Sequence, residues 1–345
     1  MGHSPYWGAE VIHDSKQNKQ LDGTLMVSTF GPEFEAMPKS GYSNQQAQEA
    51  IYNDMQAAGL RCRIYRGVVH TTTPHWKIVP DGSVHGGFEL VAPILKGEAG
   101  IREMKTVVRI ATRYSRITQA CGLHTHFGVM DKRTFNRTGN LVWHEMTHDQ
   151  QQRCLRSRQV KRMQVRLNNI MAHFEPAIDW LVSPSRRAGR NGTMCGGGSH
   201  TRIPSYESEP YINSRRFASQ GPTGGGRFGR YMKVNFHALA RHGTVEFRQH
   251  QGTMNAVKSE MWIKLCYRLF ARSWQQEYLN VDVREYPQTI AGLMDFCGFG
   301  TRIRNWFKRR ATSFGAPDRI VNGDGHPDGV LTGRANGGRR AGTVA

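Results

Sequence analysis

Five short segments of this 345-residue chain alternate apolar side chains with acidic, imidazole or guanidinium side chains, and this pattern constrains the fold most strongly. They read FGPEFE, GGFELVAP, GLHTHFGV, YMKVNFHAL and GTVEFRQHQ. Because the side chains of a strand point alternately to the two faces of a sheet, each segment predicts a strand with one apolar face. We therefore expect helices to cover that face.

The other face of these strands holds the candidate site residues. In chain order they are Glu33, Glu35, Glu89, His124, His126, Tyr231, Lys233, Asn235, His237, Glu246, Arg248 and His250. Antiparallel sheets commonly have one polar, exposed face, and this would explain the polar residues of any one of these strands. Five strands rich in Glu, His, Arg and Asn fit that explanation less well.

Several carboxylates gathered on one face repel one another and raise each other's pKa unless cations lie between them. Oxygen ligands with few imidazoles favour Mg²⁺ or Mn²⁺ over structural zinc. A divalent metal together with arginine then indicates a polyphosphate ligand.

The formal net charge of +20 is unevenly distributed. The Gly/Arg-rich segment 184–230 has eight Arg and two Glu, and the chain from Thr301 onward has nine Lys or Arg and three Asp. A positive field favours anionic partners such as nucleotides, nucleic acid, cell-wall polymers or acidic peptides. A solvated basic surface with a disordered tail is the alternative explanation.

The sequence predicts a cytoplasmic protein without a membrane span. The N-terminus does not resemble a signal peptide, and no run of about 18 apolar residues occurs. The six cysteines form no CxxC pair, which favours reduced, mostly buried thiols.

The remaining periodicity predicts the organisation of the chain. Helices are expected over 43–60, 98–118, 148–182 with a break near Pro176, 256–276, 289–299 and 302–311, and short strands over 61–69 and 75–81. We expect an N-terminal arm over 1–27, a catalytic domain over 28–312 with a functional or mobile loop at 184–230, and a basic, disordered tail over 313–345.

Six motifs in order resemble the amidoligases, which are related to glutamine synthetase and glutamate–cysteine ligase. They are FGPEFE, the Trp76 to Asp81-Gly82-Ser83 spacing, GGFELVAPIL, CGLHTH, PSRRAGRNGTMC and VNFHALARHGTVEFRQHQGTM. The resemblance covers about residues 28–312. It implies an α+β fold in which a curved antiparallel sheet, backed by helices, forms an active-site funnel.

The resemblance also implies roles for individual residues. The implied metal ligands are Glu33, Glu35, Glu89, His124 and Glu246, with His126 close by. Arg248 is expected to stabilise the phosphoryl group in transit, and Arg186 or Arg187 to bind a phosphate or a substrate carboxylate. Asp81, Asn235 and Lys233 are weaker candidates for nucleotide or substrate contacts.

The activity implied is an ATP-dependent and Mg²⁺-dependent ligase that joins a carboxylate to an amine through an acyl phosphate. The alternative from another class is a basic nucleic-acid-binding or virion-associated protein with a vestigial ligase site. In that protein the basic loop and tail would bind the polyanion.

The segment HEMTH at 144–148 fits the zinc-peptidase signature H-E-x-x-H and offers a third interpretation. The extended form with a third histidine is absent. A downstream Glu175–Asp179 pair stands at a tolerable spacing, but Pro176 interrupts the helix expected there. We therefore expect His144 and His148 to be surface or capping residues.

Overall fold

The computed structural model describes residues 29–67, 69, 71–82, 84–129, 146–156, 158–187, 193–194, 198–199, 233–279 and 282–323. Their main feature is a nine-stranded sheet in the order β10-β11-β7-β1-β4-β3-β2, with β5 and β6 also paired to β1. All its pairs are antiparallel except β2 with β3.

The strands are short apart from the central ones. They are β1 Thr29–Pro38, β2 Cys62–Ile64, β3 Trp76–Pro80, β4 Phe88–Val91, β5 Leu95–Lys96, β6 Ser115–Arg116, β7 Gly122–Gly128, β10 Val234–Asn235 and β11 Thr244–Gln251. A separate two-stranded sheet pairs β8 Thr193–Met194 with β9 Gly198–Ser199.

Each of the six predicted helical regions contains at least one helix, and the described residues also include short helices that were not predicted. The α-helices are α3 Asn44–Ala57, α4 Gly97–Ala111, α6 His148–Arg156, α7 Arg158–Ile178, α10 Ala238–His242, α11 Ala256–Leu279, α12 Ile290–Cys297, α13 Thr301–Ser313 and α14 Asp318–Asn322. Short 3-10 turns are η2 Asp179–Leu181, η3 Pro184–Arg186 and η7 Val283–Glu285.

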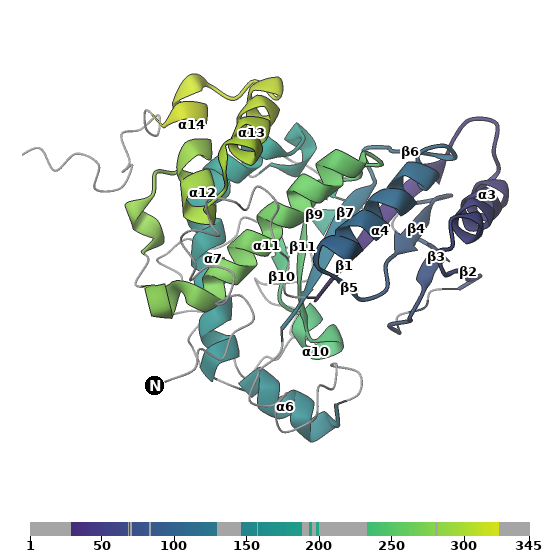
Figure 1. Cartoon of the computed structure of the whole chain (residues 1–345), viewed down its shortest axis with the longest axis horizontal. Helices are drawn as coiled ribbons and strands as arrows, with labels where there is room; N and C mark the ends of the chain where they lie inside the picture. Colours follow the sequence, from purple (N-terminus) through teal and green to yellow (C-terminus); the bar gives the residue numbers. More distant parts are fainter. Residues whose placement is uncertain are drawn as a thin grey trace, which may run out of the picture.

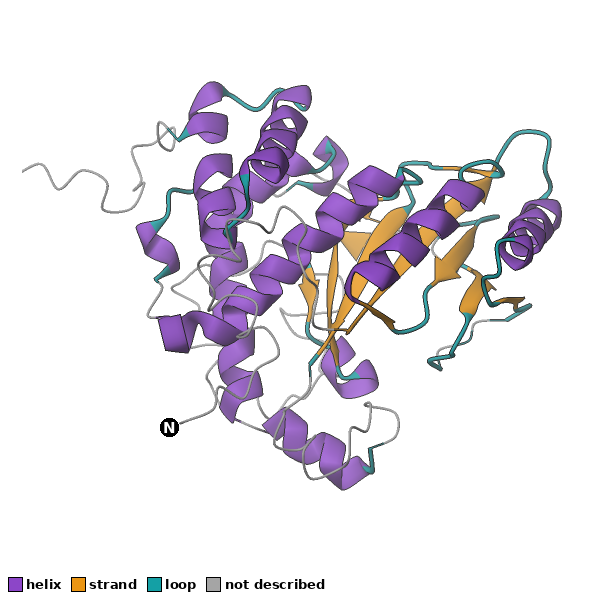
Figure 2. Cartoon of the chain, viewed as in Figure 1, coloured by secondary structure: helices purple, strands orange, loops and turns teal. Residues whose placement is uncertain are grey.

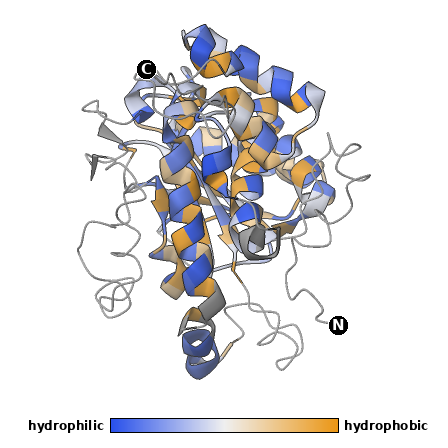
Figure 3. Cartoon of the chain, turned by 90° about the vertical axis from the view of Figure 1, so that its left-hand side faces the viewer, coloured by the Kyte–Doolittle hydropathy of each residue, from blue (hydrophilic) through white to orange (hydrophobic). Residues whose placement is uncertain are grey.

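Helices α4 and α11 lie across one face of the sheet (Figures 1 and 2). The apolar sides of the central strands pack against them, as Phe127 of β7 does on Phe270 of α11 with ring centroids 5.6 Å apart. In Figure 3 the helices carry both hydrophilic and hydrophobic residues, as amphipathic helices do. The sheet face away from these helices holds the acidic and imidazole side chains.

The break expected near Pro176 is confirmed, since α7 ends at Ile178 with Pro176 in its last turn. Two predictions of local structure need correction. Residues 318–322 of the predicted disordered tail form α14, whose Ile320 and Val321 are buried. The fourth predicted strand is only Val234–Asn235, and His237 precedes α10 instead.

None of the helices among the described residues is long and apolar enough to span a bilayer. Most of the basic loop and the end of the tail lie outside the described residues, as does Tyr231.

Candidate active site

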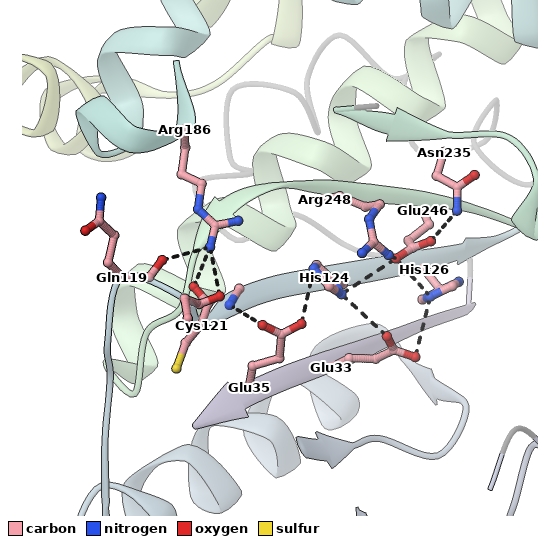
Figure 4. Close-up of polar contacts among 12 residues, drawn as sticks. Glu33, Glu35, Gln119, Cys121, His124, His126, Arg186, Asn235, Glu246 and Arg248 are labelled. Carbon is pink, nitrogen blue, oxygen red and sulfur yellow. Dashed lines mark hydrogen bonds and ion pairs between the residues drawn. The ribbon is translucent and has the colours of Figure 1, made fainter. Parts of the chain in front are cut away.

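Strand pairing brings the acidic and imidazole side chains of four neighbouring strands together. Glu33 of β1 stands opposite His124 of β7, and Glu246 of β11 stands opposite His126. On the other side of β1, Glu35 stands opposite Glu89 of β4. Because directly opposed residues share a face, these side chains form one cluster, and Figure 4 shows its members from β1, β7 and β11.

His124 lies at the centre of this cluster and is almost fully buried. Its Nδ1 is 3.8 Å from Glu33 Oε2 and 3.7 Å from Glu246 Oε1, and its Nε2 is 3.6 Å from Glu35 Oε1. Among the described residues no hydrogen-bond partner is found for the buried Nε2.

Two groups of side chains have the donor atoms and spacing of metal sites. One is Glu33, His124 and Glu246, and the other is Glu35, Glu89 and His124, each with ligand atoms within 4.8 Å of one another. The donor set is mostly carboxylate oxygen, which suits a hard divalent cation. The unsatisfied His124 nitrogen between the carboxylates also fits a site for such a cation.

Charge in the cluster is only partly balanced by the protein. Burial raises the pKa of Glu33, but the imidazoles of His126 and His124 outweigh burial and hold this pKa well below its usual range. Burial and the neighbouring Glu33, Glu35 and Asp81 raise the pKa of Glu89 well above its usual range. Arg248 offsets only part of this effect, so a bound cation would add positive charge where the Glu89 side of the cluster needs it.

The β11 side of the cluster has its own cation. Arg248 Nη1 donates to Glu246 Oε1, and Asn235 Nδ2 donates to Glu246 Oε2 at 2.6 Å. Burial raises the pKa of Glu246, but Arg248 and the two histidines lower it overall. These contacts place both predicted residues, Arg248 and Asn235, in the cluster.

His126 is held by a residue that the sequence analysis did not single out. Its Nδ1 lies 2.8 Å from Thr244 Oγ1, and its Nε2 lies 3.5 Å from Glu33 Oε1 and 3.8 Å from Glu246 Oε1. Burial lowers the pKa of His126, but Glu33 and Glu246 raise it overall. A threonine at a strand start gave no signal that could have identified this role.

A cavity of about 510 Å³ adjoins the cluster and is lined by both polar and apolar residues. Glu33 and His126 line it on the cluster side, while Lys77, Ile94 and His242 line it elsewhere. Lys77 of β3 was also missed. It stands opposite Val91 of β4, which in turn stands opposite Glu33 of β1, so Lys77 is on the same face of the sheet as Glu33. Its Nζ donates to the carbonyls of Val69 and Thr71.

Lys233 and Arg187 lie elsewhere than predicted. The Lys233 ammonium is 1% exposed and pairs with Glu175 and Asp179, at 2.8 and 2.5 Å. The Arg187 guanidinium stacks over the ring of Trp180 at 4.4 Å. A lone basic residue in a sequence does not reveal such partners.

Arg186 also differs from the prediction of a phosphate or carboxylate clamp. Its side chain is 1% exposed, and its Nη2 donates to the carbonyl of Cys121 at 2.6 Å.

Asp81 follows β3 and lies close enough to Glu89 to raise the pKa of Glu89.

His250 was predicted on the same face as Glu246 and Arg248, and this is wrong. A register shift between Phe247 and His250 places His250 opposite Leu123, on the core side. There its ring packs on Trp262, with centroids 4.9 Å apart. The cause is a β-bulge, which adds a residue to one strand and reverses the alternation beyond it.

The HEMTH segment is only partly described, because His144 and Glu145 lie outside the described residues. His148 is exposed and begins α6, where Thr147 and Gln150 exchange capping hydrogen bonds. Glu175 and Asp179, the possible third ligands, are paired with Lys233.

An open, mostly antiparallel sheet thus has, on the face away from α4 and α11, a carboxylate-rich cluster with the donor set of a candidate site for hard cations. Residues 26–270 match the family described as "Putative amidoligase enzyme", so the chain belongs to that family. No curated protein matches the chain.

Among solved structures, a bifunctional glutathione synthetase from Pasteurella multocida is similar, with 12% identity and a TM-score of 0.41. The match covers 90% of this chain and 50% of that chain. The present chain therefore spans about half the length of that structure.

Proposed function

We propose that the protein is an ATP-dependent ligase that joins a carboxylate to an amine through an acyl phosphate. The observation that supports this best is the convergence of Glu33, His124 and Glu246 from three strands, with Arg248 beside them. Membership of the amidoligase family supports the same reaction class. We further propose the glutamine synthetase-like funnel as the fold around this cluster.

The reaction needs two balanced steps. A carboxylate oxygen attacks the γ-phosphorus of ATP, the bond to the bridging oxygen breaks, and ADP leaves. The amine nitrogen then attacks the acyl carbon, the bond to the phosphate oxygen breaks, and the nitrogen loses a proton. When bound, two divalent cations would neutralise the phosphate charge and orient the phosphoryl group.

The side chains of the chain would divide this work. Glu33, His124 and Glu246 would hold one cation, and Glu35 with Glu89 the other. These side chains are suited to holding cations, because the carboxylates of the cluster outnumber its cationic groups.

Arg248 would stabilise the charge of the phosphoryl group during transfer. Its side chain is 10% exposed, so little water would screen that interaction. The contact with Glu246 fixes its position beside the proposed cation.

Hydroxylamine provides a test that does not require the natural amine. The protein is mixed with ATP, Mg²⁺, hydroxylamine and a panel of carboxylic acids, and hydroxamate and ADP are measured together. We expect equal amounts of hydroxamate and ADP with at least one acid. Release of AMP and pyrophosphate instead would contradict the acyl-phosphate mechanism.

Two variants locate the activity, and a third serves as control. Glu246→Gln removes a preorganised charge, and Arg248→Lys keeps the charge but loses the planar fork of the guanidinium; each variant should lose at least about a hundredfold in rate. Glu260→Gln should keep the rate, because Glu260 pairs with Lys105 and Lys264 on the helical layer. An active Glu246→Gln variant would refute the proposal.

A further inference from the structure

Arg186 is a buried cation directed at the main chain that leads into β7. Its Nη2 donates to the carbonyl of Cys121 at 2.6 Å and lies 3.4 Å from the carbonyls of Gln119 and Ala120 (Figure 4). A side chain that is 1% exposed and directed at three main-chain carbonyls is poorly placed to bind a substrate. It is well placed to hold the turn 119–121.

That turn is connected to Glu35 through one peptide group. The carbonyl of Cys121 and the amide of Gly122 belong to the same peptide unit, and the Gly122 amide donates to Glu35 Oε2 at 2.6 Å. A cation at the carbonyl polarises the peptide unit and strengthens donation by its N–H group. Arg186 therefore acts on Glu35 without touching it.

The surroundings fix the position of this peptide unit. The Gly252 amide also donates to the Cys121 carbonyl, at 2.7 Å. A Cβ on Gly252 would lie 2.5 Å from Cys121 Cβ, so the chain after β11 approaches the turn as closely as glycine allows. Gln249 Nε2 in turn lies 3.4 Å from the Arg186 carbonyl.

The contact of Arg186 with this peptide unit affects one of the two groups of candidate ligands. With Oε2 held by Gly122, Glu35 presents Oε1 to His124 Nε2 at 3.6 Å. The same carboxylate belongs to the group with Glu89, while Glu33 and Glu246 belong to the other group. His124 belongs to both groups, but the carboxylate that Arg186 acts on, Glu35, belongs to only one of the two candidate cation positions.

We propose that Arg186 is a positioning residue for the cation position formed by Glu35 and Glu89. This inference rests on the proposed metal-dependent function, and it assigns Arg186 a role different from binding substrate. The guanidinium fixes and polarises the Cys121–Gly122 peptide unit, which holds Glu35 in the orientation that a cation requires.

Titration of the intact protein with Mn²⁺, followed by the electron paramagnetic resonance signal of free Mn²⁺, tests this role. We expect two classes of site in the wild type. Glu246→Gln should weaken one class, and Glu35→Gln should weaken the other. Arg186→Met should weaken the Glu35 class at least about tenfold and leave the other within twofold, as loss of a residue behind a metal ligand typically does.

Arg268→Met is the matched control. Arg268 is another arginine with 1% exposure, but it lies on α11, with its guanidinium 5.9 Å from the centre of the Phe299 ring. Arg268→Met should keep both classes of site. If Arg186→Met does not fold, Arg186→Lys replaces it; the Lys variant keeps the charge but not the fork geometry, and it should weaken the same class.

The inference is overturned if the Arg186 variants bind Mn²⁺ as the wild type does or lose both classes equally. It is also overturned if Arg268→Met shows the same selective loss. Two Mn²⁺ classes in the wild type with no effect of Arg186 would reject this inference alone. A wild type without two classes would reject the proposed pair of metals as well.

Discussion

Replacing Lys233 with methionine should strongly destabilise the fold, although Lys233 takes no part in the cluster. The Lys233 ammonium is 1% exposed and lies 2.8 Å from Glu175 Oε1 and 2.5 Å from Asp179 Oδ1. Methionine has a similar length and no charge. The two carboxylates would then stay in the interior without their cation.

The cost follows from that burial. Removing one partner of a buried ion pair typically costs about 3–5 kcal/mol, because a desolvated charge is left uncompensated. Gln249 Nε2 still donates to Asp179 Oδ1 at 2.6 Å and offsets part of the loss. We therefore expect Lys233→Met to lower the free energy of unfolding by about 3–4 kcal/mol.

Urea unfolding followed by circular dichroism measures this free energy. The triple variant with Glu175→Gln and Asp179→Asn added should recover most of it, because no buried charge remains. Arg113→Gln is the control, since the ion pair of Arg113 with Asp54 is largely exposed and worth at most about 1 kcal/mol. A Lys233→Met cost no larger than that of the control, or a triple variant no better than Lys233→Met, would refute the reasoning.

Three further outcomes are expected. Burial lowers the pKa of His250 from 6.5 to about 3, so below pH 6.5 the unfolded state binds more protons. Stability should then fall by up to about 1.4 kcal/mol per pH unit down to about pH 3, and His250→Gln should flatten this slope in pH-dependent urea unfolding. Glu89→Gln should raise the melting temperature without metal, because it relieves carboxylate repulsion, and should reduce the further rise given by Mn²⁺ in calorimetry. Ser43→Ala should cost about 1 kcal/mol in urea unfolding, because Ser43 and Gln46 form the capping box of α3.

Strand alternation predicted which acidic and imidazole side chains of each strand share a face, and the amidoligase resemblance implied that these faces meet in one site. Strand pairing brings Glu33, Glu35, His124 and Glu246 together. The reason is that the register of a half-buried strand is strongly specified by its apolar side. The rule held as long as the strands were regular.

It failed where the backbone departs from regular geometry or where a charge is buried. The bulge in β11 turns His250 toward Trp262, and no residue type in the segment marks the extra position. Lys233 and Arg186 were both assigned to ligand contacts. Their true partners are two carboxylates far away in the sequence and a set of main-chain carbonyls, which single-sequence patterns do not reveal.

His124 faces both halves of the cluster, yet a neutral imidazole has only one lone pair for coordination. A cation on Nδ1, beside Glu33 and Glu246, leaves Nε2 protonated as a donor toward Glu35. A cation on Nε2 reverses these assignments. The tautomer of this ring therefore selects which pair of carboxylates shares a ligand with the metal and which receives a hydrogen bond.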